Sequence, residues 1–184
     1  MKLHRQWIVL LALSAIFVAP LAFAWALYHA ADGQPQGGLQ HGELLLPLQA
    51  LEPPSLDTVE GALLDKRVFR GRWTLHYYTR ERCMADCRQL LSMLQRVRLA
   101  QGQSMAQVQR VLVLTALPSA NDIASLVAGA SDLHVASASR WPLEPGYVYL
   151  LDPQGNLVMR YPPGFEPRGL LKDLQRLLRL AGAE

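Results

Sequence analysis

The sequence lacks the motifs that mark several common enzyme classes. It contains no Gly-rich phosphate-binding loop, no His-Glu-x-x-His and no Gly-x-Ser-x-Gly, so an ordinary enzyme of these classes is not indicated. Its 18 basic residues, 15 of them arginine, form no dense block, which argues against nucleic-acid binding. Internal repeats are absent. Cysteine is scarce as well, because the 184 residues include only Cys83 and Cys87. This pair is the main candidate for a functional site.

The N-terminal region contains an uncharged apolar stretch. Residues 7–28 carry no charge over 22 positions, enough to cross a hydrocarbon core of about 30 Å as a helix. Lys2 and Arg5 precede this stretch, so the positive-inside rule places the N-terminus in the cytoplasm and the remainder outside. We expect residues 1–28 to form a single-pass anchor in the inner (cytoplasmic) membrane. The alternative is a cleaved signal peptide, because Ala22-Phe23-Ala24 has the small-x-small form of a cleavage site.

The remainder of the chain divides into a tether and one domain. Residues 29–42 are rich in Gly and Gln without apolar periodicity, which is typical of a flexible tether. Residues 43–184 are long enough for one domain with a core. In a bacterium the domain would face the periplasm, which is oxidising. Two cysteines there form a disulfide, a redox pair or a metal site.

The cysteines follow a predicted strand directly. Residues 73–78 are aromatic and β-branched, which favours a buried strand. After Cys83, apolar residues recur at intervals of three and four, which predicts an amphipathic helix that includes Cys87 and ends near Gly102. A spacing of four places both sulfurs on one helical face, close enough to share a metal or a disulfide.

The other predicted elements alternate between strands and helices. Pro153 and Gly155 have the positions that a type I turn favours, so a hairpin is expected around them. Ser119 and Asp122 have the spacing of a helix N-cap pair. In chain order we expect an edge strand or extended arm at 43–51, a central strand at 111–117, a helix after 119, a loop at 131–146, a hairpin at 147–161 and an amphipathic helix at 170–178.

This order, with cysteines at a strand-to-helix junction, resembles a thioredoxin-like fold. The segment 70–79 running into Cys83-Met84-Ala85-Asp86-Cys87 resembles the Sco/SenC family of cytochrome c oxidase assembly proteins, and Tyr149 to Gly155 resembles the closing hairpin of that family. The resemblance spans roughly residues 43–180. It implies an α/β, thioredoxin-like domain, with a central mixed sheet flanked by helices, behind one N-terminal transmembrane helix.

The resemblance also implies a function. Sco/SenC proteins are implicated in delivering copper to the binuclear copper centre of the oxidase, or in keeping the cysteines of that centre reduced. By this likeness Cys83 and Cys87 are the redox-active thiols and the ligands of Cu(I), and the partner is the copper-bearing oxidase subunit or another assembly factor. The histidine that supplies the third copper ligand in the family aligns at about Glu144 here, and His134 is well upstream. Two thiolates alone suit two-coordinate Cu(I).

Two alternatives stay open. As a thiol–disulfide oxidoreductase, the chain would use Cys83 as an exposed attacking thiol and Cys87 as the resolving one. The helix N-terminus and three nearby arginines would favour the thiolate, while Glu81 and Asp86 would oppose it. As a non-catalytic binding module, the domain would keep a structural disulfide and dock on an oxidase assembly partner. The three arginines are Arg80, Arg82 and Arg88.

Overall fold

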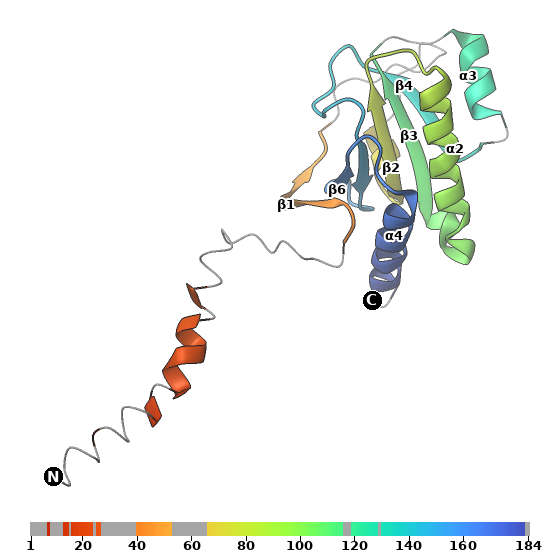
Figure 1. Cartoon of the computed structure of the whole chain (residues 1–184). Coiled ribbons are helices and arrows are strands. Elements are labelled where there is room, and N and C mark those ends of the chain that lie inside the picture. The colour runs from red at the N-terminus through yellow and green to blue at the C-terminus, as the bar shows by residue number, and fades with distance from the viewer. Residues whose placement is uncertain are drawn as a thin grey trace. The chain divides into compact units, whose positions relative to one another are not determined.

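The computed structural model describes most of the predicted domain and part of the N-terminal stretch (Figure 1). Contacts divide the chain into two units, Met1–Leu39 and Gln40–Glu184, which are treated separately. The predicted division at residues 28 and 42 stays a prediction. The described residues are 7, 13–14, 16–23, 25–26, 40–52, 66–115, 119–128 and 130–182.

Within the first unit, every described residue of the predicted anchor is helical. The described large apolar side chains there, Trp7 and Leu13 among them, are between 56% and 74% exposed. The remainder of residues 1–28 lies outside the described part. Among the residues that are described, no helix is both long enough and apolar enough to span a bilayer. The transmembrane helix therefore stays a prediction.

A six-stranded mixed sheet forms the centre of the second unit. The strand order is β1-β6-β5-β2-β3-β4. β3 is parallel to both of its neighbours, whereas the pairs β2·β5, β5·β6 and β1·β6 are antiparallel. The mixed sheet predicted from the sequence is thus confirmed. The strands are β1 (Glu43–Ala50), β2 (Trp73–Thr79), β3 (Val108–Leu114), β4 (Leu133–Ser137), β5 (Val148–Leu151) and β6 (Asn156–Tyr161).

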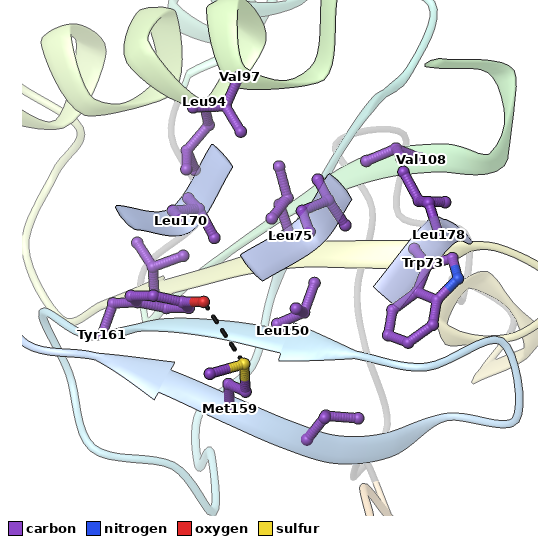
Figure 2. Packing of buried hydrophobic residues seen from close by; sticks show 13 residues of the cluster. Trp73, Leu75, Leu94, Val97, Val108, Leu150, Met159, Tyr161, Leu170 and Leu178 are labelled. Carbon is purple, nitrogen blue, oxygen red and sulfur yellow. Dashed lines mark hydrogen bonds between the residues drawn. The ribbon is translucent and has the colours of Figure 1, made fainter. Parts of the chain in front are cut away.

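Three helices cover one face of this sheet: α2 (Ala85–Leu99), α3 (Ala120–Val127) and α4 (Pro167–Ala181). Figure 1 shows α2 and α4 in front of the strands. The buried stripe of α2 follows the predicted periodicity, and Figure 2 shows Leu94 and Val97 above Leu75 of β2, with Leu170 of α4 beside them. The predicted hairpin and C-terminal helix are confirmed. Helix α3 begins at its predicted cap, where the Ser119 hydroxyl oxygen accepts the N–H of Asp122.

The opposite face is covered by shorter segments. The 3-10 helix η1 (Lys66–Phe69) and the loop after β4 contribute Phe69 and Trp141, which pack with Tyr78, Tyr149 and apolar residues of β3. A second 3-10 turn, η2 (Gly102–Gln107), joins α2 to β3. Alternate residues of each strand therefore face either the helical layer or this aromatic layer.

One prediction of secondary structure is wrong. Residues 131–146 were expected to be a loop throughout, but Leu133–Ser137 form the edge strand β4, parallel to β3. Leu133 and Val135 face the helical layer, while Ala136 packs in the aromatic layer. Because this strand has five residues and includes small and polar ones, its period-two pattern is too weak to stand out in the sequence.

A buried ion pair links β3 to the residue before β4 and also contacts α2. Arg110 of β3 donates hydrogen bonds to both carboxylate oxygens of Asp132, at 2.7 and 3.2 Å, and a third to the carbonyl oxygen of Leu91 in α2 at 2.9 Å. Both charged residues are at most 5% exposed. This bidentate arrangement satisfies the buried guanidinium and fixes α2, which bears Cys87, relative to the sheet.

The start of the folded unit is anchored by Asp173 of α4. Its carboxylate accepts the backbone N–H groups of His41 and Gly42, the hydroxyl of Tyr161, and a contact of 3.2 Å from the His41 ring. A Cβ on Gly169 would lie 2.6 Å from His41, so glycine is needed at this close approach. Asp173 therefore holds His41 and Gly42, which directly precede β1, against α4.

Candidate functional site

The site is the junction between β2 and α2, where the two cysteines lie. β2 ends at Thr79, Cys83 lies in the following loop, and Cys87 is in the first turn of α2. The two cysteines form a disulfide, with their Cα atoms 5.0 Å apart. The structure thus brings together the two residues that the spacing predicted to be close. Their assignment as catalytic and copper-binding residues stays a prediction.

Both sulfur-bearing residues are buried. Cys83 is 7% and Cys87 8% exposed, and both pack with Leu91 of α2, Ile123 of α3 and Leu114 of β3. The expectation that Cys83 is an exposed attacking thiol is therefore wrong for this state of the domain. Sequence spacing places a residue on a helical face, but it does not show that a second helix crosses the same spot. Ile123 of α3 therefore forms part of the cover over the disulfide.

The disulfide lies at the N-terminal end of α2, where the helix carries partial positive charge and Asp86 of the first turn adds a negative charge. Met84 is the N-cap and no side chain accepts the first free N–H groups, so the helix terminus retains its partial positive charge. The Ser119 hydroxyl lowers the pKa of the Asp122 carboxyl, and the charges of Arg88 and Arg82 lower it further. Two of the three predicted arginines are thus close to α3, where Asp122 offsets part of their charge. A thiolate released on reduction is stabilised by the helix terminus and arginines and disfavoured by Asp122.

Histidine, cysteine and carboxylate side chains supply no third metal ligand to the pair in the described part of the domain. No group of three or more His, Cys, Asp and Glu side chains there could hold a metal ion. Glu144, at the aligned histidine position, donates its N–H to the Tyr149 hydroxyl at 3.1 Å, and its carboxylate accepts from Arg160 at 3.4 Å. Tyr149 belongs to the aromatic layer, whereas the cysteines lie in the helical layer. The Glu144 carboxylate is therefore engaged by Arg160 and its backbone by Tyr149.

The two histidines of the sheet are also on the wrong face for a shared site. His76 of β2 lies in the aromatic layer, where its ring contacts Phe69 and Trp141. His134 of β4 is paired in the sheet with Val111 of β3. The Val111 side chain lies in the aromatic layer, so His134 is on that face as well. Burial and the charge of Arg72 lower the pKa of His134. His76 is a fully buried core residue. Among the described residues, the reduced site would therefore offer two thiolates as ligands.

The role of α3 was not visible in the sequence. The spacing of Ser119 and Asp122 predicts a helix cap, but nothing in the pattern connects this helix with the cysteines. Their position follows from the parallel crossover between β3 and β4, and β4 itself was missed. Recognition of the alternating residues Leu133 and Val135 as a strand would have placed α3 as the crossover helix over the cysteine end of the sheet.

Fold and site together define a thioredoxin-like domain with a disulfide at the junction of a central strand and the helix that follows it. The chain belongs to the family described as transmembrane-like, thioredoxin-like, C-terminal domain, whose sequence model matches residues 73–181. No curated protein matches the sequence.

Solved structures of Sco proteins share the fold. Sco1 from Thermus thermophilus, solved in the apo form, aligns with a TM-score of 0.58 at 19% identity, covering 77% of this chain and 99% of that one. ScoI from Arabidopsis thaliana, solved with copper bound, aligns with a TM-score of 0.57 at 16% identity, covering 72% and 99%. BsSco, a Sco-family cytochrome c oxidase assembly protein with an identified disulfide switch, aligns with a TM-score of 0.52 at 10% identity, covering 72% and 96%. The predicted Sco/SenC resemblance is confirmed as a likeness of fold.

Proposed function

We propose that this protein is a thiol–disulfide exchange and Cu(I)-handling factor for the assembly of cytochrome c oxidase. The observation that carries the proposal is the disulfide between Cys83 and Cys87 at the end of β2, in a thioredoxin-like frame. The fold shared with BsSco and with copper-bound ScoI supports the assignment of both activities.

The position of the disulfide favours exchange over simple cross-linking. It joins cysteines that are only four positions apart, and the loop-entropy model gives the smallest stabilisation to the shortest loops. In the exchange, a thiolate of the partner attacks one sulfur of the pair and forms a mixed disulfide. A second partner thiolate then releases the domain as a dithiol and leaves the partner oxidised, so that two electrons and two protons pass to the domain. The reverse direction reduces the partner.

Copper is the cargo of the reduced state. The disulfide offers no thiolate, whereas the reduced pair offers two soft sulfur ligands that suit Cu(I). Because Glu144 is held by Tyr149 and Arg160, we expect it to contribute no third ligand. Copper loading is therefore coupled to the redox state of Cys83 and Cys87.

The cellular setting belongs to the same proposal. An uncharged stretch at residues 7–28, with described side chains that are largely exposed, supports a single-pass anchor in the cytoplasmic membrane. The domain would then face the periplasm, an oxidising compartment in which disulfides persist. There we expect it to act on the copper-bearing subunit of the oxidase or on another assembly factor.

One observation favours a second function. Both cysteines are more than 90% buried, which suits a structural disulfide in a non-catalytic module that docks on an assembly partner. The two functions differ in whether the pair is reduced under mild conditions and binds copper afterwards.

An anaerobic Cu(I) titration of the reduced full chain, against a chromogenic Cu(I) chelator, tests the proposal. We expect one Cu(I) per chain, binding that is lost in Cys83→Ser/Cys87→Ser, and unchanged affinity in His134→Ala and Glu144→Ala. Binding by the wild type that is no tighter than that of the double serine variant would contradict the copper function.

A further inference from the structure

A cavity of about 510 Å³ lies beside the thiol site and has no role in the function proposed so far. It lies between α2 and the segment that joins β6 to α4. Its apolar lining comes from partly buried side chains. They pack against the hydrophobic core between the sheet, α2 and α4, and they also line the cavity. They are Tyr77 of β2, Leu90 and Met93 of α2, and Phe165.

Tyr77 connects the cavity to the cysteines. Its ring packs against the hydrophobic core between the sheet, α2 and α4. It also packs against the separate cluster that contains Cys83 and Cys87. Burial raises the pKa of the Tyr77 hydroxyl, and the nearby side chains of Thr79, Glu81 and Asp86 also influence it. The tyrosine is thus at the end of β2 that continues into the cysteine loop. Asp86, which also lines the cavity, is the residue before Cys87 of the disulfide.

The cavity is elongated along α2 and has opposite charges at its ends. Asp86, one residue before Cys87, lines one end, and Arg96 lines the other. Ten helical residues separate them, which corresponds to about 15 Å along the helix axis. Arg96 is exposed and has no ion-pair partner among the residues that the structure describes. A length of about 15 Å matches four or five residues of extended polypeptide at about 3.3 Å each.

We propose that this cavity binds an extended segment of the polypeptide whose thiols exchange with Cys83 and Cys87, and this inference rests on the proposed function. The segment places a cysteine at the Asp86 end, one or two apolar side chains on Met93 and Phe165, and an acidic side chain against Arg96. A cavity of this shape explains how a protein thiol is selected over a small thiol, since only the protein thiol gains apolar contacts along α2. It also positions the incoming sulfur at the N-terminus of α2.

The test measures binding without exchange. The probe is a five-residue peptide, acetylated and amidated, with serine at one end, leucine and phenylalanine in the middle and glutamate at the other end, synthesised in both chain directions. The full chain is kept oxidised, in detergent, with ¹³C-labelled methionine methyl groups. We expect a saturable shift of the Met93 methyl signal with one of the two peptides and none of Met105, which lies on η2 away from the cavity.

Charge reversal supplies the matched control. Arg96→Glu should weaken the glutamate peptide about fivefold and strengthen a peptide with lysine in place of glutamate by a similar factor. Arg176→Glu, on the exposed side of α4 and outside the cavity, should change neither affinity. A Met93 signal that stays fixed at millimolar concentrations of both peptides would overturn the inference. Because serine replaces cysteine in the probe, this result is independent of whether the disulfide exchanges or the pair binds copper.

Discussion

The indole N–H of Trp141 donates a hydrogen bond of 2.9 Å to Nε2 of His76, and this contact fixes the tautomer of a fully buried imidazole. Because Nε2 accepts, the ring proton lies on Nδ1, which donates to the carbonyl oxygen of Val111 at 3.1 Å. Burial lowers the pKa of His76 to about 4, although the bond to Val111 acts in the opposite direction. The neutral ring has a partner for each nitrogen, and a second ring proton would break the bond with Trp141.

This arrangement predicts a pH dependence of stability. An unfolded histidine titrates near pH 6.5, so between about 6.5 and 4 the unfolded chain binds more protons than the folded one. The free energy of unfolding should therefore fall as the pH is lowered through this window, by up to about 1.4 kcal/mol per pH unit. Urea unfolding at several pH values measures the slope. His76→Gln should be less stable at pH 7 and lose this part of the slope; equal slopes in both proteins would contradict the assignment.

A second prediction concerns the buried pair of Arg110 and Asp132. Burial alone would raise the pKa of the Asp132 carboxyl, but the hydrogen bond and charge of Arg110 outweigh it and the pKa is lowered. Its stabilising contribution is therefore complete above the unfolded pKa near 3.9 and is lost as the pH falls through the lower folded value. Asp132→Asn leaves the guanidinium buried without a charge partner, which should cost about 3–5 kcal/mol at pH 7.

Glu166→Gln is the matched control for Asp132→Asn, because Glu166 is exposed and its side chain makes no cap hydrogen bond. We expect a change within about 0.5 kcal/mol for this control. Chemical unfolding of the three proteins at pH 7 measures the difference. If Asp132→Asn is as stable as the control, the ion pair does not hold α2 on the sheet.

A third prediction follows from the cover over the disulfide. Ile123 of α3 packs in the cluster that contains both cysteines, so its truncation should make the sulfurs more accessible. We expect Ile123→Ala to be reduced by dithiothreitol several-fold faster than the wild type, because exchange depends on access to the attacked sulfur. Leu99→Ala, at the half-exposed end of α2, should react at the wild-type rate. An unchanged rate in Ile123→Ala would show that α3 does not limit access.

Most of the fold could be predicted from local patterns. The stripe of Leu94 and Val97 in α2, the turn at Pro153 and Gly155, and the cap at Ser119 are each determined by residues close in sequence, and the structure contains all three elements. β4 was missed because a five-residue edge strand with small residues has little apolar alternation. The anchoring of His41 by Asp173 joins residues 132 positions apart, and no local pattern carries such a contact.

The candidate site was predictable only in part. Two cysteines at a helical spacing indicate a shared disulfide or metal site, and the structure contains the disulfide. The burial of Cys83 depends on α3, and the isolation of Glu144 depends on Arg160 and Tyr149. These are tertiary contacts between elements whose order in the sheet was not known from the sequence.

The reduction potential of the Cys83–Cys87 pair tests the central claim most directly. The full chain is equilibrated with defined ratios of oxidised and reduced dithiothreitol or glutathione, and free thiols are counted by alkylation and mass measurement. An exchange-active pair should have a potential above about −300 mV, so that cellular thiols of similar potential reduce and reoxidise it. A potential below about −300 mV would identify a structural disulfide and contradict the proposed exchange function.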